Sequence, residues 1–318
     1  MSRYLVTGGA GFIGSHIVEQ LLEDGHFVGV LDNFSSGKKE NLSFTRSLSP
    51  KAFVLVKGDI RDKDTCLKAT KGMDFVLHQA ALRSVPKSLN NPKIYNEVNI
   101  QGTLNMLEAS RDNKVKCFVL ASSSSIYGEA LGFPEKEDDA ARLISPYALT
   151  KLAGEYYCKI FAKHYSLNCV SLRYFNVFGE RQSSDDEYSV VIPKFISCLL
   201  NNTPPPIHGT GRQSRDFTYI DNVVQANIMV TKKRNLTGEV FNIAGGKDFS
   251  ILSLVKILNE ILDKNIKPVF LPKRPADVFR TQADLSKAKR LLAYSPQVDF
   301  VQGLKLTVEY FKKDRLNG

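Results

Sequence analysis

Cysteine is scarce in this sequence and forms no paired motif. The five cysteines are scattered along the 318 residues, at positions Cys66, Cys117, Cys158, Cys169 and Cys198. An odd number without C-x-x-C spacing argues against a secreted scaffold stapled by disulfides. Long hydrophobic runs are absent as well, because no stretch approaches the ~18 consecutive apolar residues that a membrane-spanning helix needs. We therefore expect neither a disulfide framework nor a membrane span.

The N-terminus leaves little room for a targeting segment. The chain reaches Thr7-Gly8-Gly9 before a secretory signal peptide could be accommodated, so the cytoplasm is the expected compartment. The composition, 43% hydrophobic and 24% charged, is that of an ordinary globular chain. Its length predicts about two domains, or one large α/β domain with an insertion. A chain of this size buries enough surface to fold without a metal or a disulfide.

The formal net charge of +10 raises the question of a nucleic-acid partner. Residues 231–290 hold thirteen Lys and Arg against six Asp and Glu, a balance of +7. The charges there alternate with Ile, Leu and Val at helical spacing and show no aromatic–basic alternation, which favours a solvated basic face over polynucleotide binding. Attraction of a small anionic substrate is a third interpretation. We expect no nucleic-acid partner.

The first thirty residues carry the strongest local pattern. A strand-like run at 3–7 leads into Gly8-Gly9-Ala10-Gly11-Phe12-Ile13-Gly14. Residues 15–24 then show one apolar helical stripe, and Gly25 stands where a C-terminal cap belongs. A second strand at 26–31 ends in Asp32. The order is strand, glycine turn, helix, strand and acid.

Apolar strands continue at intervals, which predicts a parallel sheet covered by helices on both faces. They are expected at residues 53–56, 75–78, 117–121 and 169–173. Beyond about residue 175 the regularity fades: 201–206 is predicted to be a loop, 251–262 and 285–292 short helices, and the chain is expected to return to the first sheet near 241–243. The fold class is an α/β, doubly wound parallel-sheet Rossmann fold with a smaller mixed α/β C-terminal lobe.

The glycine turn predicts a dinucleotide pyrophosphate site. Its glycines permit the tight turn, the close approach of the phosphates and the packing of helix against strand. The helix N-terminus offers unpaired N–H groups to the phosphates. Asp32 is placed to accept hydrogen bonds from the adenosine ribose hydroxyls and would repel a 2′-phosphate, so NAD is favoured over NADP.

Tyr147 and Lys151 stand four residues apart on a predicted helix, so both can point at one ligand. A phenol with a pKa near 10 is a poor base at neutral pH, and a nearby ammonium favours the phenolate. Ser122 to Ser125 follow the strand at 117–121, at the edge where such sheets bind ligands. One of these hydroxyls could hold a substrate hydroxyl; the alternative is a serine turn that satisfies its own backbone.

Together these motifs resemble the extended short-chain dehydrogenase/reductases, in particular the nucleotide-sugar 4-epimerases. The resemblance extends over nearly the whole chain. It rests on Thr7 to Gly14, Gly58-Asp59-Ile60, His78 to Ala81, Asn99, Tyr147 with Lys151, Arg173 to Asn176, Gly209-Thr210-Gly211, Arg215-Asp216-Phe217 and Arg274-Pro275-Ala276-Asp277. One departure is Ala276, where the family usually has glycine.

The resemblance implies two domains and a role for each set of site residues. Residues 1–175, with a return at 218–245, would form the NAD-binding domain, and 176–217 with 246–318 the nucleotide-sugar lobe. Tyr147 would be the general base, Lys151 would bind the nicotinamide ribose and acidify Tyr147, and Ser123 would position the hydroxyl. The implied NAD-binding residues are Gly8, Gly11, Phe12, Ile13, Gly14, Asp32, Asn33, Ser36, Gly37, Asp59, Ile60, Gln79, Ala80, Ala81, Asn99, Tyr147, Lys151 and Tyr174. The implied substrate-binding residues are Ser123, Asn176, Arg215, Arg274, Asp277 and Thr281; no metal is expected.

The resemblance also distinguishes between the reactions that related enzymes catalyse. Related dehydratases carry an acidic pair just after the Ser123 position, and UDP-glucuronate decarboxylases a glutamate at the Ser125 position, whereas this chain has Ser124 and Ser125. It therefore implies 4-epimerisation of a UDP-hexose through a 4-keto sugar. Thr281 replaces a bulky tyrosine that accompanies restriction to non-acetylated hexoses, so UDP-GlcNAc/UDP-GalNAc is expected beside UDP-glucose/UDP-galactose.

Three alternatives stay open: a UDP-glucuronate 4-epimerase, a decarboxylase, and a catalytically silent NAD-binding regulator. A regulator would be expected to lack Tyr147 or Lys151, which this chain keeps. The resemblance further implies a homodimer formed by two helices of each subunit, at about 95–112 and 147–165.

Overall fold

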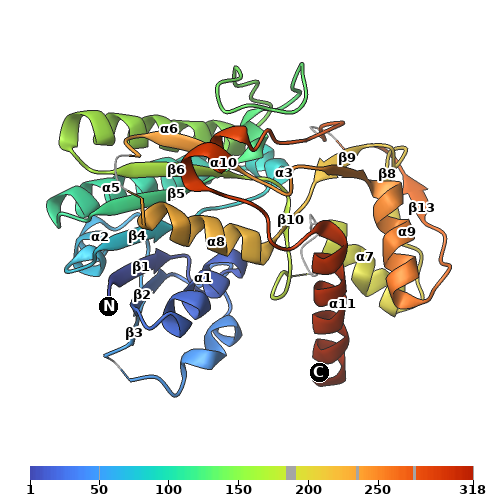
Figure 1. The fold of residues 1–318 in the computed structure, drawn as a ribbon, viewed down its shortest axis with the longest axis horizontal. Coiled ribbons are helices and arrows are strands. Elements are labelled where there is room, and N and C mark those ends of the chain that lie inside the picture. Colours follow the sequence, from blue (N-terminus) through green and yellow to red (C-terminus); the bar gives the residue numbers. More distant parts are fainter. Residues whose placement is uncertain (50, 184–190, 234–235, 275–276, 318) are drawn as a thin grey trace.

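A seven-stranded sheet is the largest element of the computed structural model, which describes residues 1–49, 51–183, 191–233, 236–274 and 277–317 (Figure 1). All neighbouring strands in this sheet are parallel. In spatial order they are β11 (Glu239–Ile243), β6 (Cys169–Tyr174), β5 (Cys117–Ser123), β4 (Phe75–His78), β1 (Arg3–Thr7), β2 (Phe27–Asp32) and β3 (Phe53–Lys57). The order reverses between β1 and β4, and ligands bind such sheets at the carboxyl ends beside the reversal.

Two layers of helices cover the sheet, and alternating strand residues supply one core to each. On one face, Tyr4 and Val6 belong to a core shared with α1 (Phe12–Glu23) and α8 (Ile220–Thr231). On the other, Leu5 belongs to the core of α2 (Lys63–Thr70), α5 (Gly102–Asp112) and α6 (Pro146–Tyr165). Figure 1 shows α5 and α6 on the side of the sheet opposite α1 and α8. The predicted doubly wound fold is confirmed.

The edge strand β3 departs from the expected burial. Its Val54 and Leu55 are 40% and 42% exposed, whereas every residue of β2 and β6 is buried. β3 pairs with β2 on one side only, so an apolar run there does not mark a strand covered on both faces. Periodicity alone does not separate an edge strand from a central one.

Short helical segments connect the strands. They are η1 (Lys39–Thr45), α3 (Val85–Asn90), α4 (Pro92–Tyr95), η2 (Asn96–Gln101, a π-helix leading into α5) and η3 (Ser124–Ile126). α1 begins at Phe12, earlier than the predicted Ser15, because the glycine turn closes at Gly11. It ends as predicted before Gly25, whose φ of +75° lets it donate to Leu22.

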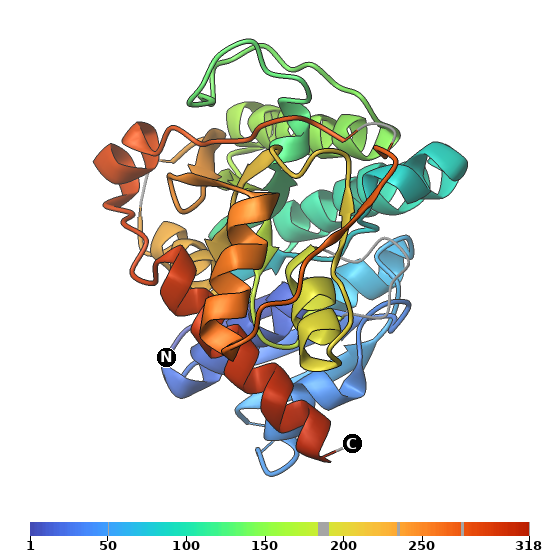
Figure 2. The same ribbon diagram turned by 90° about the vertical axis from the view of Figure 1, so that its right-hand side faces the viewer.

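The remaining elements build a smaller lobe beside the carboxyl ends of the sheet. They are β7 (Val177–Phe178), α7 (Val191–Leu200), β8 (Pro206–His208), β9 (Ser214–Asp216), β10 (Thr218–Tyr219), β12 (Asp248–Ser250), α9 (Ile251–Leu262), β13 (Val269–Leu271), α10 (Ser286–Leu292) and α11 (Phe300–Asn317). Helices α7, α9 and α11 pack against one another (Figure 2). The predicted loop ends one residue early, because Pro206 pairs with Val269.

The division at residues 175 and 245 stays a prediction. β11 completes the large sheet, and α8 covers it. α10, from the segment assigned to the second lobe, packs against β11. The two lobes therefore exchange segments along the sheet edge.

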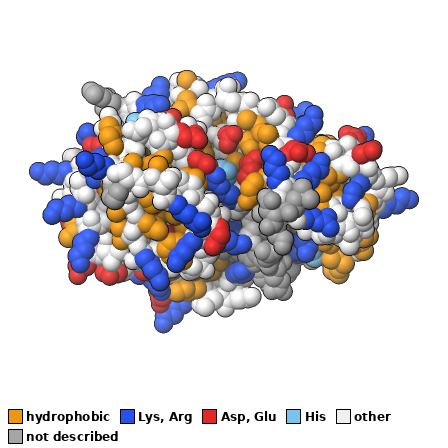
Figure 3. All heavy atoms as spheres, turned by 90° about the horizontal axis from the view of Figure 1, so that it is seen from below, with side chains coloured by type: hydrophobic (Ala, Val, Ile, Leu, Met, Phe, Trp, Pro, Cys, Tyr) orange, Lys and Arg blue, Asp and Glu red, His pale blue; other side chains and the backbone are white. Residues whose placement is uncertain are grey.

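Charge is spread over the face seen in Figure 3. Lys and Arg side chains lie around this surface with acidic and apolar side chains between them. None of the helices in the described part of the chain combines the length and the apolar character needed to cross a bilayer.

Candidate active site

The glycine turn between β1 and α1 is closed by contacts between backbone atoms. A Cβ on Gly14 would lie 2.2 Å from the Gly8 carbonyl oxygen, and one on Gly8 would lie 2.8 Å from the Ala80 nitrogen. Gly8 also has a φ of +67°, which L side chains rarely adopt. At Gly11, in contrast, a Cβ would meet only the Gly8 oxygen, so the backbone is open there. No side chain caps α1, and its first N–H groups are left for an anion.

Acidic residues at the end of β2 and just after β3 organise the far end of the same cavity. Asp32 is 7% exposed and accepts hydrogen bonds from the backbone nitrogens of Ala10 (2.9 Å) and Phe34 (2.8 Å). Asn33 donates to Asp59 at 2.9 Å. Hydrogen bonds from Arg61 hold the pKa of Asp59 below its usual value, so that carboxylate is charged. The glycine turn, the uncapped helix and a fixed carboxylate fit a dinucleotide such as NAD.

One cavity of about 1150 Å³ joins this end to the smaller lobe. All the predicted NAD-binding and substrate-binding residues except Asn99 line it. Asn99 is 3% exposed; it exchanges hydrogen bonds with both backbone groups of Leu82 and donates to Thr150 at 3.0 Å. Its position suits support of the loop after β4 rather than contact with a ligand.

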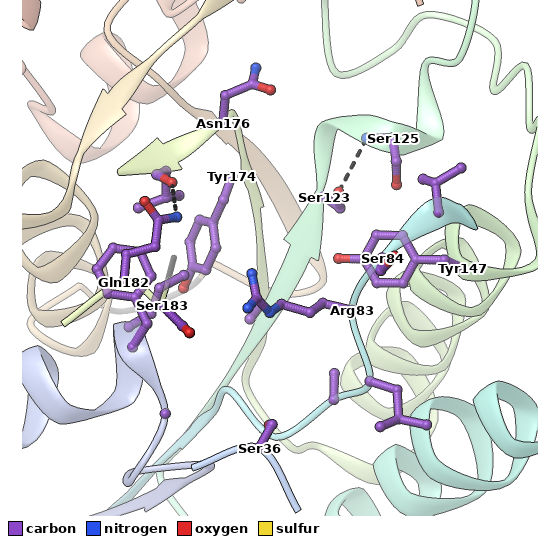
Figure 4. A pocket seen from close by; sticks show the side chains of 18 of the residues that line it. Ser36, Arg83, Ser84, Ser123, Ser125, Tyr147, Tyr174, Asn176, Gln182 and Ser183 are labelled. Atoms are coloured by element: carbon purple, nitrogen blue, oxygen red, sulfur yellow. Dashed lines mark hydrogen bonds between the residues drawn. The ribbon is translucent and has the colours of Figure 1, made fainter. Parts of the chain in front are cut away.

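Ser123, Tyr147 and Lys151 come together at the end of β5 and the start of α6. Figure 4 shows the Tyr147 hydroxyl directed toward the Ser123 side chain, which comes from the end of the strand. Ser145 caps α6 by accepting from Ala148 at 3.2 Å, and this fixes the first turn on which Tyr147 lies. Lys151 follows one turn later and donates to the Ala121 carbonyl oxygen at 2.8 Å.

Burial raises the pKa of Tyr147, and the facing Ser123 and the positive charge of Arg83 oppose that shift. The spacing of Tyr147 and Lys151 predicts that the ammonium favours the phenolate and so lowers the pKa of Tyr147. The Lys151 ammonium lies 5.9 Å from the Tyr147 ring centroid and is engaged by Ala121, so desolvation outweighs its effect in the protein alone. Burial also lowers the pKa of Lys151 to about 8.

Polar side chains behind the loop after β4 fix its backbone. His78 contacts Thr7 at 2.8 Å and Thr103 at 3.1 Å, and burial lowers its pKa to about 3, so it is neutral at physiological pH. The Tyr174 hydroxyl donates to Gln79 at 3.2 Å. Gln79 and Tyr174 therefore brace the floor of the cavity from β4 and β6.

The predicted substrate residues of the smaller lobe pair with one another. Asn176, with a φ of +34°, donates to Thr281 at 3.1 Å. Arg215 donates to Asp277. Arg274 lines the cavity too. Pro275 and Ala276 lie outside the described residues, so the departure at Ala276 has no structural account.

Two features of the site were not predicted as site residues. Arg83 extends into the cavity between Tyr147 and Tyr174 (Figure 4). Glu155 and Arg173 form a buried ion pair below the cavity, with Nη2 and Oε2 2.8 Å apart. Arg173 belonged to a recognised motif, whereas the spacing of Glu155, four residues after Lys151 on one helix, was the available signal for its position.

The chain matches a known family over most of its length. The model of the NAD dependent epimerase/dehydratase family matches residues 4–244. The chain belongs to this family. It is similar to the putative UDP-glucose 4-epimerase of Methanocaldococcus jannaschii, with 39% identity over 98% of each chain. Among solved structures it is similar to the UDP-N-acetylglucosamine 4-epimerase of Methanobrevibacter ruminantium in complex with UDP-N-acetylmuramic acid, with a TM-score of 0.92 and 40% identity over 98% of this chain and 99% of that one.

A third similar protein was solved with its cofactor. It is the UDP-glucuronic acid 4-epimerase of Bacillus cereus in complex with UDP-glucuronic acid and NAD, with a TM-score of 0.90 and 36% identity over 98% of this chain and 99% of that one. Three predictions are confirmed: the chain is an extended short-chain dehydrogenase/reductase, it is an enzyme of the epimerase type, and it uses NAD. The site residues and the choice of hexose stay predictions.

Proposed function

We propose that this protein is an NAD-dependent 4-epimerase of UDP-hexoses that accepts both acetylated and non-acetylated sugars. The observation that carries the proposal is the meeting of Ser123, Tyr147 and Lys151 at the centre of one cavity. The dinucleotide turn lies at one end of that cavity, and Arg215 and Arg274 lie at the other.

The chain's own residues supply the proton chemistry. Tyr147, as the phenolate, takes the proton of the sugar's C4 hydroxyl, and Ser123 holds that hydroxyl within reach. The Lys151 ammonium stabilises the phenolate. NAD, held by the glycine turn and Asp32, would supply the redox chemistry at C4: a hydride acceptor for oxidation to the 4-keto sugar and a hydride donor for its reduction from the opposite face. Tyr147 then gives the proton back, so the overall reaction changes only the configuration at C4.

Epimerisation requires the hexose to turn over while the nucleotide stays bound. The guanidinium groups of Arg215 and Arg274 suit the diphosphate, because their planar donors match phosphate oxygens. Thr281 lines the cavity, and its side chain is small. A small residue at this position supports acceptance of a 2-acetamido group.

Elimination and decarboxylation fit the cavity less well. Ser124 and Ser125 line it beyond Ser123, where the related dehydratases and decarboxylases carry acids. A hydroxyl there does not replace a carboxylic acid as a proton donor.

UDP-glucuronate 4-epimerisation is the second candidate. Arg83 supports it, because this cation extends into the cavity beside Tyr147 and could face the carboxylate of a uronic acid. The Bacillus cereus enzyme, which was solved with UDP-glucuronic acid, is 36% identical to this chain.

A homodimer through η2–α5 and α6 is part of the proposal. The outer side of α6 exposes Leu149, Tyr156 and Ile160, which are 52%, 56% and 45% accessible. Apolar side chains spaced along one helix suit a helix-to-helix contact with a second copy. Light scattering after size-exclusion chromatography should give twice the 35.5 kDa mass of the chain, and a monomer would count against this part.

The test of the function is NMR of the protein with NAD, incubated separately with UDP-glucose, UDP-GlcNAc and UDP-glucuronate. We expect axial 4-hydroxyl product from the first two. Product from UDP-glucuronate alone would favour the second candidate, and carbon dioxide release would favour a decarboxylase. Tyr147→Phe, which keeps the ring and removes the hydroxyl, should lower turnover by about 10²–10⁴-fold. Full turnover in Y147F would contradict the mechanism.

A further inference from the structure

The last three residues of β5 each meet a side chain of α6. The Ala121 carbonyl oxygen accepts from Lys151 at 2.8 Å, and the Ser122 hydroxyl donates to Glu155 at 2.5 Å. Ser123 faces Tyr147 (Figure 4). The reacting groups thus depend on the register between one strand end and one helix. Ser122 lines the cavity as Ser123, Tyr147 and Lys151 do, whereas Glu155 lies behind that wall.

Glu155 also belongs to a polar row that crosses the sheet. Ser122, Arg173 and Asn242 stand side by side on β5, β6 and β11 and are 3%, 4% and 0% exposed. Parallel strands covered on both faces usually carry apolar residues in such positions. Arg173 donates to the two carboxylate oxygens of Glu155 at 2.9 and 2.8 Å.

Hydrogen bonds extend the polar row from the ion pair toward β11. Arg173 also donates to the Tyr127 hydroxyl at 2.8 Å, and Tyr127 donates to Asn242 at 2.7 Å. Removing two charges from water is costly, and apolar residues of the same volume often serve stability as well as a buried ion pair does. A buried ion pair retained directly behind the reacting groups therefore points to a role in the reaction.

We infer that Glu155 is a positioning residue, which holds the end of β5 in register with α6 and keeps Lys151 in its charged form. This inference rests on the proposed 4-epimerase function. Glu155 follows Lys151 by one helical turn, on the same face of α6. Arg173 forms an ion pair with Glu155 at this depth, with Nη2 and Oε2 2.8 Å apart.

Among the described groups around Lys151, Glu155 is the one whose charge favours the ammonium form. Burial lowers the pKa of Lys151, and the negative charge of Glu155 opposes that shift. From β4, His78 is neutral and adds no charge. Arg173 on β6 weakens the effect of Glu155, while Arg83 acts on Tyr147. The Tyr95 ring on α4 meets the edge of Tyr147 and is uncharged.

The test compares three single variants by their pH profiles of kcat/KM for the hexose that the wild type turns over. Glu155→Gln keeps the shape and removes the charge, so the basic limb, where Lys151 loses its proton, should move down by about one pH unit. Ser122→Ala removes one contact and keeps the charge, so it should lower kcat several-fold with the limb unmoved. Glu108→Gln neutralises a carboxylate that pairs with Lys63 on neighbouring helices, and it should change neither.

The outcomes decide between positioning and plain stability. An E155Q profile that falls equally at every pH, or one that matches the wild type, overturns the inference. If E155Q does not fold, the double variant E155Q/R173Q leaves no unpaired buried charge and should show the same downward shift at smaller size. An unmoved limb in that folded double variant also overturns it.

A second measurement separates this inference from the proposed function. The titration of Lys151, followed by NMR of ¹³C-labelled lysine and assigned with Lys151→Met, needs no substrate. A wild type that turns over none of the three sugars refutes the proposed function. A lower Lys151 pKa in E155Q than in the wild type would still establish the electrostatic support, and an equal pKa in the two proteins would refute it.

Discussion

The two halves of the cavity are held in place by different means. In the cofactor half, backbone meets backbone: Gly14 packs on Gly8, and Gly8 packs on Ala80. In the substrate half, side chains meet across long stretches of sequence. Asn176 reaches Thr281, 105 residues later, and Arg215 reaches Asp277, 62 residues later.

This difference separates rigidity from selectivity. A backbone cradle admits no added atom, and it suits a cofactor that stays bound through the reaction. Pairs of side chains can be exchanged individually, so they suit the role proposed for this half, which is recognition of a substrate that enters, turns and leaves. Damage to the first half should therefore remove NAD binding as a whole, and damage to the second should alter substrate preference or affinity.

The largest effect is expected from Gly14→Ala. Its Cβ would lie 2.2 Å from the Gly8 carbonyl oxygen, a backbone atom that cannot move without opening the turn. We expect NAD affinity to fall by at least ~100-fold, or about 3 kcal/mol, through this overpacking. Isothermal titration of the NAD-free protein measures it.

The matched control is Gly132→Ala, because nothing lies within 4 Å of a Cβ built there. It should bind NAD as the wild type does. A G14A protein with wild-type NAD affinity would show that the cradle is not set by backbone contacts.

Arg215→Ala tests the substrate half. Arg215 is 11% exposed and pairs with Asp277, so its loss removes a charge-assisted donor and leaves a carboxylate beside the diphosphate. KM for the UDP-hexose should rise about 30-fold, about 2 kcal/mol, while NAD affinity stays unchanged. Steady-state kinetics measures the first and titration the second. Arg212→Ala, on the exposed part of the same segment, is the control; a parallel loss of NAD affinity in R215A would contradict the independence of the halves.

The difference between the two halves of the cavity also decides which site residues could be predicted from the sequence. The turn at Gly8–Gly14, Asp32 and the pair Tyr147–Lys151 were predictable because each depends on residues close in the chain. The resemblance added Asn176, Arg215 and Thr281, which no local pattern singles out. The contacts that these residues make depend on how β9 packs against the segment after β13.

Burial and contacts between distant segments could not be predicted from local patterns. Spacing along a helix says nothing about burial, which raises the pKa of Tyr147 in the protein without NAD. Asn99 was expected in the cavity wall, yet its amide is occupied by Leu82 and Thr150. The tie between Ser122 and Glu155 needs the register of β5 against α6, which emerges only on folding.

Glu135 lies where the segment between β5 and α6 joins the second half, and it gives a pH-dependent test of that junction. It is fully buried, accepts from the Gln282 nitrogen at 3.0 Å, and its backbone bonds Gln282 and Asp284. Burial raises its pKa from 4.5 to about 8. The folded state therefore binds the proton more tightly than the unfolded state, and stability is lost as pH rises from about 4.5 through about 8.

Glu135→Gln removes that titration. Its unfolding free energy relative to the wild type should rise with pH across this window, by up to about 1.4 kcal/mol per pH unit. Urea unfolding at pH 5, 6, 7 and 8 measures the difference. Burial also raises the pKa of Asp216 to about 7, and its negative charge contributes to the raised pKa of Glu135. Glu135→Gln in an Asp216→Asn background repeats the comparison without that second titration. A difference that stays constant with pH would mean that Glu135 is ionised at neutral pH.

The smallest effect concerns the choice of hexose. Thr281 is 5% exposed and accepts from Asn176 at 3.1 Å and from the Asp216 nitrogen at 3.3 Å, so a larger side chain there can grow only into the cavity. Thr281→Tyr should lower kcat/KM for UDP-GlcNAc relative to UDP-glucose by about tenfold, the scale of a steric change in one pocket. Thr281→Ser keeps the hydroxyl and the small size, and it should leave the ratio unchanged. Competition between the two sugars in one tube, followed by NMR, measures the ratio directly. A T281Y protein with the wild-type ratio would place the acetamido group elsewhere in the cavity, and the substrate half would then select its sugar through other pairs.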